Sequence, residues 1–376
     1  MLSGGIPIGK AFGIPLRLHY SWFIIFALIT WALAASYFPD EYPTWSTTEA
    51  IAAGIITSLL FFASVLVHEL MHSIIARREG IPVQSITLFI FGGVSQLTQE
   101  PKRPIDEFRM TIVGPGSSLV LGGIFWALYF GLHHGTGAAQ FIGAISYWLG
   151  LINLSLGVFN LIPGFPLDGG RVLRSILWGR SHNLLKATKT ASSIGRGMGY
   201  LFIFVGIWFV FAGQFFNGIW LAFIGWFLES AAANSYRQLI VQEKLQGHKA
   251  KEIMSQDCLK VDPEITIEKL VNEHILTSGR RCFTVVENDR VQGLVTMHNV
   301  KQVPRHLWGT KKVKDAMTTL ENVKSVGPDE ELVTVLKIMS ENDINQVPVI
   351  EDHTILGIIG RDKIISFLDI HKELGE

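Results

Sequence analysis

Three polar residues, His68, Glu69 and His72, interrupt a strongly apolar stretch that reads SLLFFASVLVHELMHSIIARREG. Residues four apart lie on one face of an α-helix, so the two imidazoles can bind one metal ion together. A zinc ion held in this way lowers the pKa of a bound water toward about 7, and the adjacent Glu69 can take its proton. The spacing therefore predicts a zinc hydrolase site with Glu69 as the general base.

The alternative interpretation of this H-E-x-x-H pattern is a chance match, which residue frequencies produce in roughly one chain in a hundred of this size. The position of the pattern argues against chance. Two imidazoles and a carboxylate within an apolar helix carry a severe burial penalty unless they bind a ligand. We therefore favour metal binding by His68 and His72.

A catalytic zinc ion normally has three protein ligands, so two histidines leave the site incomplete. Asp168 is the candidate for the third ligand, within the stretch NLIPGFPLDGGR. Two prolines end the apolar segment before Asp168, and the two glycines after it allow close approach of the backbone. Spacing alone leaves a second interpretation open, in which Asp168 caps a helix or pairs with Arg171.

The elements that carry these residues follow from the distribution of charge. Charged residues make up 17% of the 376 residues, against about 25% in soluble proteins, and the mean hydropathy is +0.33. Residues 1–236 hold only 23 charged side chains, whereas residues 237–376 hold 41. The chain is therefore expected to be a membrane domain followed by a soluble domain.

A membrane-spanning helix needs about 20 mostly apolar residues. Six stretches meet this requirement: 19–38, 50–76, 110–132, 138–162, 197–213 and 215–233. All 13 Lys and Arg residues before position 237 fall in loops on one side, and the loops around 39–49, 133–137 and 213–217 hold none. The positive-inside rule then predicts that both termini are cytoplasmic.

Composition also excludes several classes of protein. The 32 basic residues balance the 32 acidic ones, so we expect no nucleic-acid partner. The high apolar content excludes a disordered chain. Only two cysteines are present, Cys258 and Cys282, which excludes a disulfide scaffold.

Two motifs together resemble the site-2 protease family of intramembrane zinc metalloproteases. The first is H-E-L-M-H at residues 68–72, and the second combines N-L-I-P at 160–163 with L-D-G at 167–169. The resemblance extends over most of residues 1–230, and the six-span layout is similar to that of the prokaryotic members.

The resemblance implies a role for each matching residue. His68, His72 and Asp168 would bind one zinc ion. Glu69 would be the catalytic base, and Asn160 would lie near the substrate.

Two further segments fit this family. Residues 81–97 are rich in β-branched side chains and are broken by Gly92–Gly93, which predicts short strands. The family has a small membrane-associated sheet here, and an extended substrate could add to its edge. Residues 114–118, GPGSS, open the third span, and we interpret them as small residues that allow close helix packing.

The C-terminal part contains an internal repeat. Lys251–Ser255, KEIMS, recurs 63 residues later as Lys314–Thr318, KDAMT. Each copy predicts the order strand, helix, strand, strand, helix. Two such copies resemble a tandem pair of cystathionine-beta-synthase (CBS) domains.

That family often binds adenine nucleotides through a G-[IV]-[VI]-T-x-x-D stretch. The first copy has Thr296 and Asn299 at the Thr and Asp positions, and the second has Gly360 and Lys363. Because the Asp is absent from both copies, Thr296 is the remaining candidate for a nucleotide contact. A dimerisation module without a ligand is an equal alternative.

The sequence thus predicts a polytopic α-helical membrane protein with a short membrane-associated β-sheet, followed by an α/β tandem CBS module. The predicted domains are 1–233 for the six-span part, 234–250 for a polar helical linker and 251–376 for the CBS pair. Within the pair, the first copy covers 251–310 and the second 311–370.

The predicted function is that of an intramembrane zinc endopeptidase, which cleaves a membrane protein within or near its span. One zinc ion per chain is expected. The CBS pair would regulate the enzyme or hold a homodimer together. The plasma membrane of a prokaryote is the expected location. The alternative function is a CBS-regulated channel or transporter that uses the same polar residues as an ion path, although the six spans lack the two related halves of a transporter.

Overall fold

The computed structural model describes residues 5–90, 92–97, 99–256, 259–288, 290–351 and 354–373. The chain divides into two compact units, Met1–Arg237 and Gln238–Glu376. Helix α8 (Phe215–Leu245) extends across this division.

The first unit contains six helical segments that are long and apolar enough to cross a membrane, as the sequence predicted. In the described part of the chain these are Tyr20–Glu41, Thr47–Arg78, Pro104–Leu132, Ala138–Asn160, Leu184–Phe211 and Phe215–Leu245. The first comprises α1 (Tyr20–Ala32), the π-helical turn η1 (Leu33–Tyr37) and α2 (Phe38–Glu41); the others are α3, α4, α5, α7 and α8.

Helices α7 and α8 are longer than hydropathy suggested. Helix α7 begins at Leu184, where the Asn183 side chain accepts a hydrogen bond from the Lys186 backbone N–H as an N-cap. Hydropathy reports only the apolar part of a helix, so the polar first turns of α7 and the polar last turns of α8 were not counted in the spans.

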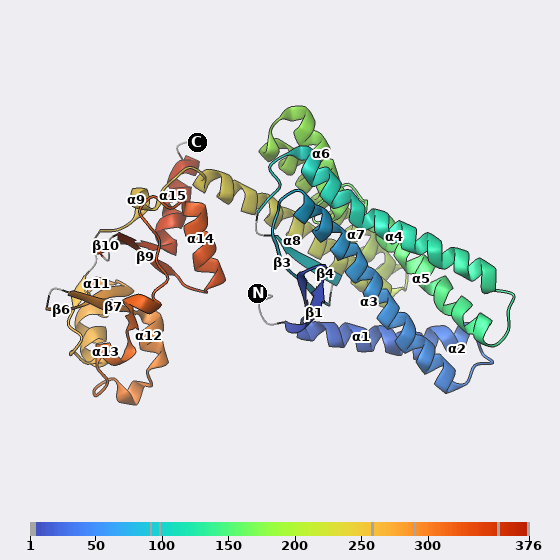
Figure 1. Cartoon of the computed structure of the whole chain (residues 1–376), viewed down its shortest axis with the longest axis horizontal. Coiled ribbons are helices and arrows are strands. Elements are labelled where there is room, and N and C mark those ends of the chain that lie inside the picture. Colours follow the sequence, from blue (N-terminus) through green and yellow to red (C-terminus); the bar gives the residue numbers. More distant parts are fainter. Residues whose placement is uncertain are drawn as a thin grey trace. The chain divides into compact units, whose positions relative to one another are not determined.

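Helices α3, α4 and α5 of the first unit run alongside one another (Figure 1). Small residues set how closely they pack. A Cβ atom on Gly122 of α4 would lie 2.7 Å from the Leu154 side chain of α5, and one on Gly157 of α5 would lie 2.8 Å from Leu119 of α4. Close packing through small residues is typical of membrane helices, because lipid competes with bulky apolar contacts.

A four-stranded sheet covers part of α3. Its strands are β1 (Ile6–Ala11), β2 (Ile14–Leu18), β3 (Val83–Phe89) and β4 (Gly92–Leu97), in the order β1-β2-β3-β4. Strands β2 and β3 are parallel and the other two pairs are antiparallel. Strand β4 is an outer strand of this sheet.

The predicted strands in residues 81–97 are confirmed, whereas the β1–β2 hairpin was not predicted. Its sequence, IPIGKAFGIPL, contains two prolines and two glycines, which are rare in strands. The hairpin turns at Phe12 and Gly13, both at positive φ, and it is stabilised by burial of Ile14 and Leu16 against Ile86 of β3.

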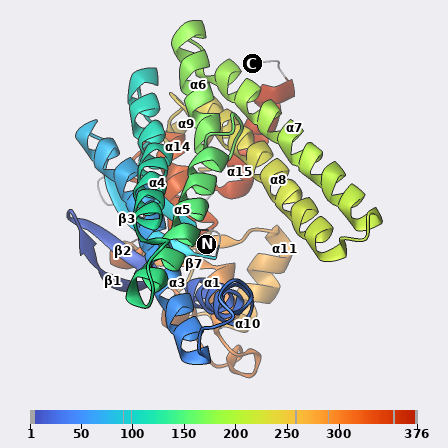
Figure 2. The same cartoon turned by 90° about the vertical axis from the view of Figure 1, so that its right-hand side faces the viewer.

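Helices α7 and α8 form a tightly packed pair, seen side by side in Figure 2. A Cβ atom on Gly199 or Gly206 of α7 would lie 2.7 or 2.6 Å from a backbone oxygen of α8. Between α5 and α7 the chain forms a short additional helix, α6 (Asp168–Ser181), which the sequence did not predict.

The second unit contains two similar halves. The first half has β5 (Lys260–Val261), a helical segment of α10 (Ile267–Lys269), η2 (Leu270–Ile275) and α11 (Leu276–Ser278), then β6 (Cys282–Glu287), β7 (Arg290–Thr296) and α12 (Met297–Gln302). The second half has α14 (Leu332–Glu341), β9 (Gln346–Glu351), β10 (Thr354–Gly360) and α15 (Arg361–Glu373).

Each half is completed by a segment that precedes the other half. Ala250, in α9 (Ala250–Ile253), is buried in the core of the second half beside Val326 and Leu332. Val313, in α13 (Val313–Ala316), is buried in the core of the first half beside Ile267. Strand β8 (Thr318–Thr319) pairs with β7 of the first half.

Candidate metal centre

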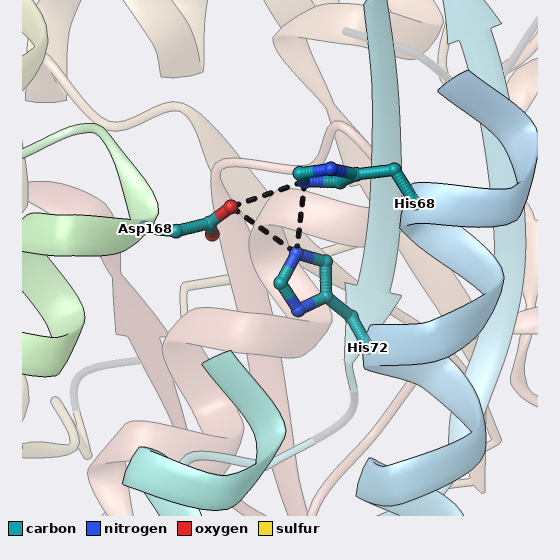
Figure 3. A group of neighbouring side chains, drawn as sticks. All are labelled: His68, His72 and Asp168. Atoms are coloured by element: carbon teal, nitrogen blue, oxygen red, sulfur yellow. Dashed lines mark hydrogen bonds and ion pairs between the residues drawn. The ribbon is translucent and has the colours of Figure 1, made fainter. Parts of the chain in front are cut away.

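The candidate site joins α3 to the start of α6. His68 and His72 lie one turn apart on α3, and Asp168 is the first residue of α6. His68 Nε2 and His72 Nε2 lie 3.1 and 3.2 Å from Asp168 Oδ2, and 3.1 Å from each other. Figure 3 shows the three side chains pointing toward a common centre.

The outer nitrogen of each imidazole is held by α4. His72 Nδ1 lies 2.7 Å from the Met110 carbonyl oxygen, which can only accept a hydrogen bond, so Nδ1 carries the proton. His68 Nδ1 lies 2.9 Å from the Ser118 hydroxyl, which can accept in the same way. Both Nε2 lone pairs are then directed at the centre of the site, the arrangement that metal-binding histidines require.

These residues fit a zinc ion. Ligand atoms about 2.0–2.2 Å from a tetrahedral zinc ion lie about 3.4 Å apart, close to the observed separations of 3.1 to 3.2 Å. Two lone pairs and one carboxylate oxygen facing one point repel one another unless a cation lies between them. Among the described residues, this is the group of His, Cys, Asp or Glu side chains arranged to hold a metal ion.

The site is largely removed from solvent. The His68 side chain is 6% exposed, that of His72 14% and that of Asp168 19%. Burial alone would raise the pKa of the Asp168 carboxyl, but positive charge at this centre, which a bound metal ion would supply, offsets burial and lowers this pKa. Asp168 is therefore available as a carboxylate.

A buried ion cluster orients α6. Glu107 of α4 is fully buried and accepts hydrogen bonds from Arg174 Nε at 2.8 Å and from Arg171 Nε at 3.5 Å. Arg174 also donates to Glu100 Oε2 at 3.0 Å. Both arginines follow Asp168 at intervals of three residues, so the cluster fixes the helix face that presents the carboxylate to α3.

Glycines allow the backbone to approach the site. A Cβ atom on Gly114 of α4 would lie 2.8 Å from His68 Nε2 and closer still to the His72 ring. A Cβ atom on Gly169 or Gly170 would clash with the backbone of residues 161–165, which turns back onto α6. Each of these positions therefore requires glycine.

The Glu69 side chain contacts the sheet. Its Oε2 accepts a hydrogen bond of 2.9 Å from the hydroxyl of Ser95 on β4. A Cβ atom on Gly93, also on β4, would lie 3.0 Å from Glu69 Cδ. The predicted base is thus adjacent in sequence to a predicted ligand and in direct contact with the outer strand.

The other predicted site residues have hydrogen-bond partners outside this group. Asn160 is the last residue of α5, and its amide donates to the Leu156 carbonyl at 3.0 Å; among the described residues no hydrogen bond links it to the metal centre. In the second unit, the Thr296 hydroxyl donates to Asn299 Oδ1 at 2.6 Å, and Asn299 Nδ2 donates to Thr318.

Sequence reasoning missed Ser118. The interpretation of residues 114–118 as packing residues accounts for Gly114, but it is wrong for Ser118, whose fully buried hydroxyl contacts His68. A small polar residue within an apolar span was the available signal, since a buried hydroxyl needs a partner. Its interval of 50 residues from His68 gave no indication of which partner that was.

Comparison with known proteins identifies the families that the chain matches. Peptidase family M50 matches residues 56–138 and 130–206, and the CBS domain matches residues 250–305 and 313–370. The chain is 33% identical to the Synechocystis sp. protein sll0528, whose name describes a zinc metalloprotease, over 98% of this chain and 96% of that relative.

Two further similarities differ in how much of the chain they cover. The chain is 31% identical to Rip3 of Mycobacterium tuberculosis over 99% of this chain and 94% of Rip3. It is also 29% identical to a site-2 protease from Methanocaldococcus jannaschii of known structure, with a TM-score of 0.42, over 61% of this chain and 94% of the other. The sequence similarity spans nearly the full length of the relatives, and the chain belongs to Peptidase family M50, with a tandem pair of CBS domains after the membrane unit.

Proposed function

We propose that this protein is a zinc endopeptidase that hydrolyses a peptide bond within or near the membrane span of another protein. The observation that carries the proposal is the convergence of His68, His72 and Asp168 within 3.2 Å of one another, with Glu69 beside them on an apolar helix. The zinc metalloproteases named among its relatives support the same chemistry.

Each residue has a distinct role in this proposal. His68, His72 and Asp168 hold the zinc ion, which supplies Lewis acidity when it is bound. Glu69 takes the proton from the attacking water and later passes it to the leaving amine. Asn160, at the end of α5, contacts the substrate.

The substrate would bind as an extended segment along the outer edge of β4. Strand addition exposes a peptide bond that a helix would shield, because the backbone groups of an extended segment pair with the strand. The contact between Glu69 and Ser95 of β4 supports this placement, since it brings the edge strand next to the base.

The test is cleavage of a single-span protein in liposomes that contain the purified enzyme. Glu69→Gln should abolish cleavage and retain zinc, because Glu69 is not one of the three proposed ligands. Glu49→Gln, on the same helix in the exposed capping box with Ser46, is the matched control and should cleave normally. Ion flux without cleavage in the wild type would instead support a channel.

We also propose that the protein lies in the plasma membrane of a prokaryote with both termini and the CBS pair cytoplasmic. The support is the clustering of all 13 basic residues before position 237 in the predicted inner loops. Cysteine labelling from each side of sealed membrane vesicles tests this orientation.

The CBS pair is proposed to regulate the peptidase or to hold two protomers together. Val241 and Leu245, at the end of α8, pack in the core of the second CBS half, so the last membrane helix continues directly into the module. Adenine nucleotide is the candidate ligand, with Thr296 as its contact. Removing residues 246–376 should change cleavage rate, nucleotide response or oligomeric state; no change in any of the three contradicts a role for the module.

A further inference from the structure

The outer strand of the sheet contacts the side chain of the proposed base. Helix α3 presents His68 and His72 on one face and Glu69 and Ser73, four residues apart, on the adjacent face. Residues alternate along a strand, so Gly93 and Ser95 of β4 point to the same side. That side is the one in contact with Glu69.

The hydrogen bonds in this contact have a defined direction. A carboxylate only accepts, so the Ser95 hydroxyl donates to Glu69 Oε2 at 2.9 Å. The single hydroxyl proton of Ser95 is then in use. Ser73, whose Oγ lies 3.0 Å from that of Ser95, must donate to Ser95 in turn. The chain Ser73–Ser95–Glu69 thus ends on one carboxylate oxygen.

Gly93 limits the position of the same side chain by contact. A Cβ atom on Gly93 would lie 3.0 Å from Glu69 Cδ and closer still to Cγ, so the strand backbone lies directly against the Glu69 side chain. Ser95 binds one oxygen of the carboxylate, and the absence of a side chain at Gly93 leaves space for Cγ and Cδ of Glu69. In the described part of the chain, Glu69 Oε1 receives no such hydrogen bond.

We propose that Ser95 is a positioning residue for the base: it holds Glu69 Oε2 so that Oε1 faces the proton of the attacking water. This inference rests on the proposed function. It adds that the strand that receives the substrate also sets the orientation of the base. Substrate pairing along β4 and alignment of Glu69 are then linked through one hydroxyl.

The first test is the kinetics of Ser95→Ala in the full-length protein. Loss of the bond leaves zinc content and KM unchanged and lowers kcat by about 10- to 100-fold, the effect of a misaligned catalytic group. Ser95→Thr, which keeps the hydroxyl, restores most of kcat. Ser85→Ala is the matched control, because Ser85 bonds to Gln96 within the same sheet and does not contact Glu69.

A second variant perturbs the same contact without removing a hydrogen-bond donor. Gly93→Ala places a methyl group against the Glu69 side chain, so it too should lower kcat with zinc retained. The inference is overturned if Ser95→Ala keeps wild-type kcat, if it loses zinc, or if it raises KM alone, since the last two results indicate a structural or substrate-binding role.

A readout that does not depend on cleavage separates this inference from the proposed function. In zinc-free protein, carbodiimide labelling of Glu69, followed by mass spectrometry, should be faster in Ser95→Ala than in the wild type and unchanged in Ser85→Ala. Equal labelling in all three overturns the role of Ser95. A wild type that shows the expected labelling but cleaves no membrane protein overturns the proposed function and leaves the contact established.

Discussion

The two imidazoles of the metal centre depend on α4 for their orientation. Met110 and Ser118 each contact an Nδ1 atom, so the Nε2 atoms face Asp168 with their lone pairs. Such outer partners typically change metal affinity by about 10–100-fold when they are removed. Ser118 can be tested on its own, because its contact is through a side chain.

Ser118→Ala should therefore weaken zinc binding by about 10–100-fold, since His68 loses the acceptor that fixes its ring and tautomer. Zinc affinity is measured by competition with a chelator of known strength. Ser117→Ala provides the control: this hydroxyl donates to the Gly114 carbonyl of its own helix, and its removal should leave affinity unchanged. Equal losses in both variants would show that the effect is not specific to His68.

At the residue scale the sequence predicted the three candidate ligands His68, His72 and Asp168, but not the side chains that contact His68 and Glu69 from other elements. Helical periodicity places His68 and His72 on one face because they are four residues apart, and it needs no tertiary information. The positions of Ser118 and Ser95 relative to α3 depend on how α4 and β4 pack. The periodicity of apolar residues does not indicate how α4 and β4 pack against α3. The contacts of Ser118 with His68 and of Ser95 with Glu69 are therefore known from the structure alone.

At the scale of elements, α6 is held in place from two sides. Glu107 of α4 binds Arg171 and Arg174 on one side. On the other, α7 packs against the turn before Asp168, where a Cβ atom on Gly195 would lie 2.8 Å from the Phe165 nitrogen. Both supports act on the position of Asp168, and each can be removed by one substitution.

Glu107→Gln should destabilise the membrane unit by about 3–5 kcal/mol, because it leaves the buried Arg174 without its main counter-charge. Burial would lower the pKa of Arg174, but Glu107 and Glu100 raise it, so the guanidinium stays charged. Denaturant unfolding in detergent measures the loss. Arg109→Gln, which removes an exposed pair with Glu79, should cost at most about 1 kcal/mol; an equal cost for both would contradict the role of burial.

Gly195→Ala should displace the turn that precedes Asp168 and so reduce zinc content, because the added methyl group collides with the Phe165 backbone. Gly197→Ala, on the same helix with nothing within 4 Å of its Cβ position, is the control. It should retain zinc and stabilise α7 by up to about 1 kcal/mol, the helix propensity difference between the two residues. If both variants retain zinc, α7 does not support the position of Asp168.

The elements themselves were predicted unevenly. The long spans follow from hydropathy, which registers any run of apolar residues long enough to cross a bilayer. Helix α6 is short and has three arginines in fourteen residues, so a search for apolar stretches does not detect it. It begins at Asp168, two residues after Pro166, and its N-cap is Leu167 without a side-chain hydrogen bond, so Asp168 does not act as the helix cap that the second interpretation suggested.

At the scale of the whole molecule, the CBS pair is joined by two exchanged segments. Lys312 and Lys314, before and within α13, bind Glu264 of the first half. Lys249 and Lys251, around α9, bind Asp329 of the second half in the same way. These hydrogen bonds and charges lower the pKa of both carboxyls to about 2.

The double variant Glu264→Gln/Asp329→Asn should loosen α9 and α13 at neutral pH. The carboxyl pKa values are lower in the folded than in the unfolded protein, so the stabilisation exists above the ordinary values of about 4 and disappears as pH falls toward 2. Amide hydrogen exchange in residues 250–253 and 313–316 measures this stabilisation, expressed as the ratio of the exchange rate in the variant to that in the wild type. A ratio that does not approach one on acidification would contradict the assignment.

The internal repeat predicted the order of elements in the first CBS half, whereas the predicted first strand of the second half is, in the described residues, only an isolated bridge between Val326 and Val349. The repeat did not predict the exchange between halves. Aligned sequences show which segments are equivalent; they do not show whether α9 completes its own half or the other one. The predicted copies, 251–310 and 311–370, describe how the sequence repeats and remain a prediction for the domain boundaries. Ala250 and Val313 instead lie in the core of the opposite half.

In the proposed metal centre, three side chains from two separated helices hold one zinc ion beside Glu69. The most direct test is the zinc content of the purified protein in four forms: wild type, His68→Ala, Asp168→Ala and Glu69→Gln. We expect about one zinc ion per chain in the wild type and in Glu69→Gln, and none in the other two. Zinc retained in Asp168→Ala, or absent from the wild type, would contradict the three-ligand site and with it the peptidase mechanism.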